Sequence, residues 1–95
     1  LRGSRIVLSW FSVAELYQGA FSSPNPQASL VDIRHFVSGY FVIIPDDDTA
    51  EIFAELRAHL RRRGEMLPDM DLLIAATAVR HGLTLLTFNL RHMAR

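Results

Sequence analysis

One stretch of the chain is apolar almost throughout and carries its only charges at its beginning. Residues 67–78 read Leu-Pro-Asp-Met-Asp-Leu-Leu-Ile-Ala-Ala-Thr-Ala. Pro68 suits the start of a helix, and Asp69 suits the N-cap position. Because nearly every side chain from Met70 to Val79 is apolar, we expect a helix buried on most of its circumference. The two acids either bind a cation or polar ligand or only complement the helix dipole, and their spacing alone favours the dipole.

The composition narrows the classes of function. The chain has 95 residues, 49% of them hydrophobic, which is enough for one small domain with a modest core. The absence of cysteine excludes disulfides, thiolate metal sites and a cysteine nucleophile. Ten basic residues, all arginine, balance ten acidic ones, so attraction to nucleic acid would depend on local clusters such as Arg61–Arg63. The sequence has no apolar run long enough for a membrane span and no secretory signal, which favours a cytoplasmic protein.

Short apolar segments alternate with helical patterns along the chain. Residues 5–10, 40–44 and 83–87 read as strands. We expect four helices around them. The first begins at a Ser12-x-x-Glu15 capping box and ends near Gly19, the second and third span 27–38 and 49–63, and the fourth follows Pro68. Alternation of this kind predicts a three-layer α/β/α fold with a short central parallel sheet, in a single domain over residues 1–95.

The expected helices leave several charged groups to assign. In parallel sheets, ligands bind beyond the carboxyl ends of the strands, where Glu15, Asp46–Asp48 and Asn89 would lie. Three adjacent acids cannot all face one ion, so we interpret Asp48 with Glu51 as a helix cap and Asp46 and Asp47 as a solvated loop. Arg61–Arg63 at a helix end complement the helix dipole, and we favour this interpretation over an RNA-binding patch. Within the helix over 49–63, the same pattern places Arg57 away from the apolar face.

Two segments resemble the motifs of a known family. Residues 71–89, Asp-Leu-Leu-Ile-Ala-Ala-Thr-Ala-Val-Arg-His-Gly-Leu-Thr-Leu-Leu-Thr-Phe-Asn, are similar to the third and fourth motifs of PIN-domain ribonucleases, particularly VapC-type toxins. Residues 8–19 resemble the second motif, a strand entering a helix that carries a glutamate. The resemblance implies a PIN-like fold and hydrolysis of RNA with Mg²⁺ or Mn²⁺. It also implies a homodimer and a cognate antitoxin that neutralises the toxin.

The resemblance assigns roles to particular residues. It implies that Glu15 and Asp71 bind the metal and act in catalysis, and that Asn89 is a further catalytic residue. Each has an alternative role: a helix cap for Glu15, a carboxylate at the helix dipole for Asp71, and a cap or turn for Asn89. Asp69 matches no motif position, and an outer role at the metal is the alternative to its N-cap role. His92 stands where many members have Asp, and imidazole is a poorer ligand for Mg²⁺ than carboxylate.

The resemblance begins at the second motif of the family. Residue 1 is Leu, and no strand carrying the Asp of the first motif precedes the second motif. The chain also stops at Arg95, short of the final segment of such toxins, so we expect a domain truncated at both ends. These features favour an alternative function, in which a catalytically inactive or truncated PIN-like module binds a protein partner or self-associates.

Overall fold

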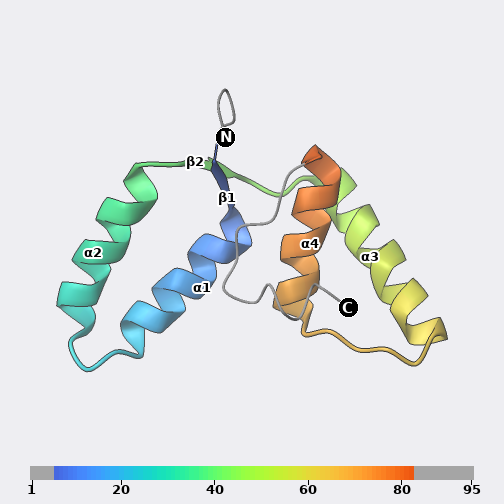
Figure 1. Ribbon diagram of the computed structural model, residues 1–95, viewed down its shortest axis with the longest axis horizontal. Helices are drawn as coiled ribbons and strands as arrows, with labels where there is room; N and C mark the ends of the chain where they lie inside the picture. The colour runs from blue at the N-terminus through green and yellow to red at the C-terminus, as the bar shows by residue number, and fades with distance from the viewer. Residues whose placement is uncertain (1–5, 83–95) are drawn as a thin grey trace. The chain divides into compact units, whose positions relative to one another are not determined.

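The computed structural model describes residues 6–82 (Figure 1). The predicted strand over 83–87, Asn89 and His92 lie outside these residues. The chain divides into two compact units, which meet in the sequence at Ile43 and Ile44.

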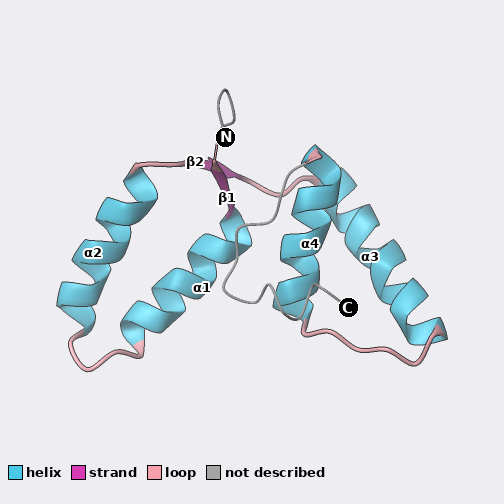
Figure 2. Cartoon of the chain, viewed as in Figure 1, coloured by secondary structure: helices cyan, strands magenta, loops and turns pink. Residues whose placement is uncertain are grey.

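The first unit contains two short parallel strands and two helices. Strand β1 (Val7–Ser9) leads into helix α1 (Trp10–Phe21), and helix α2 (Pro26–Ser38) leads into strand β2 (Phe41–Ile43) (Figure 2). The two strands pair in parallel with Leu8 opposite Val42. The predicted parallel sheet and its strands over 5–10 and 40–44 are therefore confirmed, with strands shorter than the apolar runs.

Helix α1 begins earlier than the sequence pattern indicated. Ser9, the last residue of β1, is the N-cap, and its Oγ accepts a hydrogen bond from the Phe11 N–H at 3.0 Å. The prediction of an N-cap at Ser12 is wrong because Ser9 already supplies a cap where the extended strand ends. The helix also continues through Gly19 to Phe21, so Gly19 neither ends nor interrupts it.

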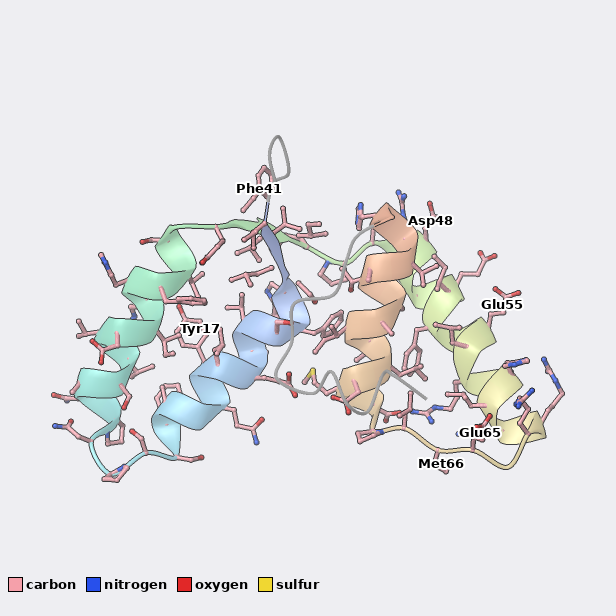
Figure 3. All side chains as sticks on the ribbon, viewed as in Figure 1. Tyr17, Phe41, Asp48, Glu55, Glu65 and Met66 are labelled. Carbon is pink, nitrogen blue, oxygen red and sulfur yellow. The ribbon has the colours of Figure 1, made fainter. Side chains whose placement is uncertain are left out.

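Helices α1 and α2 form a hairpin with a short polar connection. Ser23 Oγ donates to the Ala20 carbonyl at 2.8 Å and lies 2.7 Å from Ser29 Oγ, which ties the connection to both helices. Asn25 caps α2 by accepting from the Ala28 N–H at 3.2 Å. In Figure 3, Tyr17 extends from α1 toward α2. The prediction of a helix over 27–38 is confirmed to within one residue.

The described part of the second unit, residues 44–82, contains two antiparallel helices, α3 (Asp47–Arg62) and α4 (Asp69–His81), which pack side by side (Figure 1). Asp46 is the N-cap of α3. Its Oδ1 accepts from the Thr49 N–H at 2.9 Å, and Thr49 Oγ1 accepts in return from the Asp46 N–H at 3.4 Å. The predicted cap at Asp48 with Glu51 is wrong, because Asp46 is extended and the helix begins directly after it.

The prediction of a mostly buried apolar helix is confirmed in α4. Ile74 is 1% exposed and Ala76 is fully buried, whereas Val79 near the C-terminal end is exposed. Gly82 ends the helix in the left-handed conformation, with φ of 62°, which glycine adopts without steric cost. No helix among residues 6–82 is both long enough and apolar enough to cross a membrane.

Candidate active site

Asp71 is the most buried acidic residue that the structure describes. It is the third residue of α4. It lies in the first turn of the helix, in which the Leu72 N–H donates a hydrogen bond to the Pro68 carbonyl at 3.1 Å. Its exposed fraction is only 3%. This burial does not fit a role for Asp71 as an exposed carboxylate that only complements the helix dipole. An ionised group is buried only when other groups compensate its charge.

Glu15 lies in the second turn of α1 and is half-buried. Its alternative role in a capping box is excluded, because Ser12 lies inside the helix and not at its N-cap. Ser12 precedes Glu15 by three residues, which places both on one face of α1. Glu15 and Asp71 each interact with at least one other group. The two acids belong to different units, so a shared metal ion stays a prediction from the motifs.

A buried arginine holds the beginning of α4, and the sequence analysis missed it. Arg57 on α3 is 8% exposed. Its Nη2 donates to the Leu67 carbonyl at 3.0 Å and pairs with the Asp69 carboxylate, and its guanidinium carbon lies 5.9 Å from the centre of the Phe53 ring. The expectation that Arg57 lies off the apolar face is wrong. Its spacing of four residues from Phe53, within the apolar stripe of α3, was the available signal.

Asp69 is the first residue of α4 and not its N-cap. The N-cap is Pro68, which contributes no side-chain hydrogen bond. The predicted capping role of Asp69 is wrong because its carboxylate is engaged by Arg57 on the neighbouring helix. Since Asp71 lies in the same helical turn, this ion pair and the bond to Leu67 hold the backbone that carries Asp71.

Replacing Asp69 with Ala is expected to lower the free energy of unfolding by about 2 kcal/mol, because the buried Arg57 loses its anion. Replacing Arg57 with Met is expected to cost less than about 1 kcal/mol, since it removes the cation together with its need for partners and keeps an apolar stem. Because the Asp69 side chain is itself 77% exposed, the free energy lost in Asp69→Ala comes from its buried partner, Arg57. Urea unfolding of both single variants and of the double variant measures these values. The double variant should resemble Arg57→Met, and an Asp69→Ala loss no larger than the Arg57→Met loss would contradict this account.

A second cluster of charges lies at the opposite end of the α3/α4 unit. Arg80 Nη2 lies 3.1 Å from an Asp46 carboxylate oxygen and 3.5 Å from one of Asp48. Hydrogen bonds from the Thr49 backbone and hydroxyl, with a smaller contribution from Arg80, lower the pKa of Asp46 to about 2. Arg80 follows Asp71 by nine residues along α4, which is about 13 Å at the helical rise. The Asp46–Asp48 triplet is therefore not part of a site with Asp71. Asp46 caps α3, and Asp46 and Asp48 pair with Arg80.

The donor set of Glu15 and Asp71 fits the metal ions that the resemblance implies. Carboxylate oxygens are hard ligands suited to Mg²⁺ and Mn²⁺, and Mg²⁺ is commonly held by one or two carboxylates while it keeps several waters. Within residues 6–82, no group of three or more His, Asp or Glu residues is arranged to hold a metal ion.

Comparison with known proteins gives a consistent set of relatives. The family model of the PIN domain matches residues 1–95. The chain is 33% identical over 91 residues to Ribonuclease VapC2 of Haemophilus influenzae, which covers 96% of this chain and 69% of the relative. It is 34% identical over 95 residues to the tRNA(fMet)-specific endonuclease VapC of Salmonella typhimurium, which covers all of this chain and 72% of the relative.

A solved structure is also similar to this chain. The crystal structure of DNA-bound VapBC from Salmonella typhimurium matches with a TM-score of 0.88 and 33% identity, over 96% of this chain and 69% of that chain. The chain belongs to the PIN-domain family, and within it to the VapC type. The α/β, PIN-like fold predicted from the sequence is confirmed.

Proposed function

We propose that this protein is a metal-dependent endoribonuclease, a toxin that hydrolyses RNA phosphodiester bonds and is neutralised by a cognate antitoxin. The observation that carries the proposal is the burial of Asp71, at 3% exposure, in the first turn of a helix whose sequence matches a PIN motif. Relatives with 33% and 34% identity are named as a ribonuclease and a tRNA(fMet)-specific endonuclease. Both names support RNA as the substrate.

In this proposal, Glu15 and Asp71 hold Mg²⁺ or Mn²⁺, and Asn89 completes the catalytic residues. A bound ion of this kind supplies an activated water and stabilises negative charge on the phosphate. Asp71 presents a carboxylate whose position is held by the first turn of α4 and by the contacts of Arg57 with Leu67 and Asp69. Glu15 presents a second carboxylate from the rigid second turn of α1.

The proposed partners are an antitoxin and a second copy of the chain. The similar solved structures include VapBC from Salmonella typhimurium and VapBC-1 from Haemophilus influenzae. The first unit exposes large apolar side chains that association would bury, a change that favours binding because it removes apolar surface from water. These side chains are Ile6, Trp10, Phe21, Val31, Phe36 and Phe41.

An RNA cleavage assay with defined metal content tests the proposed activity. The purified protein is expected to cleave RNA with Mg²⁺ or Mn²⁺, to lose this activity in excess EDTA, and to regain it when Mn²⁺ is restored, because the ion supplies the activated water. Undiminished cleavage in EDTA would contradict metal dependence. Absence of cleavage under every metal condition would favour the second candidate, an inactive PIN-like module that binds a partner or self-associates. The small number of described metal-binding side chains favours that candidate.

A further inference from the structure

The C-terminal end of α3 carries an unusual concentration of positive charge. His59, Arg61 and Arg62 lie in its last turn, and Arg63 is the C-cap. Arg63 is neutralised by Glu65, with Nε and Oε1 2.8 Å apart. Arg61 and Arg62 are exposed and form no ion pair among the residues described. Two guanidinium groups at this end are therefore available to an external anion.

Within residues 44–82, acidic side chains predominate at one end of the α3/α4 unit, whereas at the other end Arg57 and Arg61–Arg63 slightly outnumber Glu65, Asp69 and Asp71, although the whole chain is neutral. Asp46, Asp47, Asp48 and Glu51 lie at or near the N-terminal end of α3, where Arg80 is their only described cationic partner. Figure 3 shows Asp48 at this end and Glu65 and Met66 in the connection at the other end. A polyanion is therefore repelled from one end of the unit and attracted to the end that carries Arg61 and Arg62.

The basic end is also the end that carries Asp71. The contacts of Arg57 with the Leu67 carbonyl and with Asp69 bring the C-terminal half of α3 beside the first turn of α4. Asp71 lies in that turn. The unpaired arginines and the proposed catalytic carboxylate therefore share one end of the same unit.

We propose that Arg61 and Arg62 bind backbone phosphates of the RNA substrate next to the bond that is cleaved. This inference rests on the proposed function, because it takes RNA as the ligand of the Asp71 site. The planar guanidinium group donates two parallel hydrogen bonds to a phosphate, and it stays charged at every working pH. A salt-dependent phosphate contact holds the substrate in register without reading its sequence.

Binding of a fluorescent single-stranded RNA, followed by anisotropy in EDTA so that cleavage is suppressed, tests the inference. The variants are Arg61→Gln and Arg62→Gln, and the matched control is Arg34→Gln, which removes an exposed arginine from α2 in the other unit. Each test variant is expected to raise the Kd about fivefold at low salt and to reduce the slope of log K against log salt by about 0.7, the value for one phosphate contact on a single strand. Arg34→Gln should change neither quantity.

Two results would overturn the inference. If Arg61 and Arg62 only complement the dipole of α3, their replacement lowers thermal stability slightly and leaves the Kd and the salt slope at the wild-type values. An equal loss of affinity in Arg34→Gln would show a general charge effect and no specific surface. Both results leave wild-type RNA cleavage intact, so they are distinguishable from failure of the proposed function, in which the wild-type protein does not cleave RNA with any metal.

Discussion

Replacing Asp71 with Asn is expected to reduce metal-dependent RNA cleavage by more than about 100-fold, because mutation of groups that only support metal ligands already costs about 10- to 100-fold. The substitution keeps the size of the side chain and removes the charge that a divalent cation requires. Single-turnover cleavage rates at saturating RNA, with Mg²⁺ and with Mn²⁺, measure the effect.

The matched control for this variant is Asp47→Asn. Asp47 is an exposed acid in the first turn of α3, at the opposite end of the same unit, so its replacement makes the same chemical change away from the proposed site. Circular dichroism should show both variants folded, and Asp47→Asn should cleave at the wild-type rate. Equal activity of folded Asp71→Asn and wild-type protein would refute the catalytic assignment.

The fold was predictable where the sequence pattern is local and strong. Helix α4 is apolar along most of its length and is bounded by Pro68 and Gly82, both of which are typical of helix ends. The parallel direction of β1 and β2 followed from apolar segments that alternate with helices, since a helical crossover connection, here α1 and α2, lets the next strand run in the same direction. These patterns depend on neighbouring residues and need no knowledge of tertiary contacts.

The caps were less predictable because several residues of suitable type stand within one turn of each other. Ser9 and Ser12 could both cap α1, and Asp46 and Asp48 could both cap α3. In each case the cap is the earlier residue, where the extended backbone of the preceding segment ends. The position at which the chain leaves the extended conformation therefore decided between chemically equivalent candidates.

The candidate site was predictable in part. The motifs identified Glu15 and Asp71, and the structure excluded the capping-box role of the first and showed that the second is buried. The partners of Arg57 could not be assigned from sequence, since they lie 10 and 12 residues away and meet it only through the packing of α3 on α4. The pairing of Asp46 with Arg80 is a tertiary contact of the same kind.

In the proposed site, Glu15 and Asp71 hold one metal ion. Calorimetric titration of Mn²⁺ into the wild-type protein, Glu15→Gln, Asp71→Asn and the double variant tests it without requiring RNA cleavage. Each single variant is expected to lower Mn²⁺ affinity by more than about 100-fold, and the double variant is expected to lose little more, because two ligands of one ion are strongly coupled. Wild-type Mn²⁺ affinity in either single variant would contradict the claim.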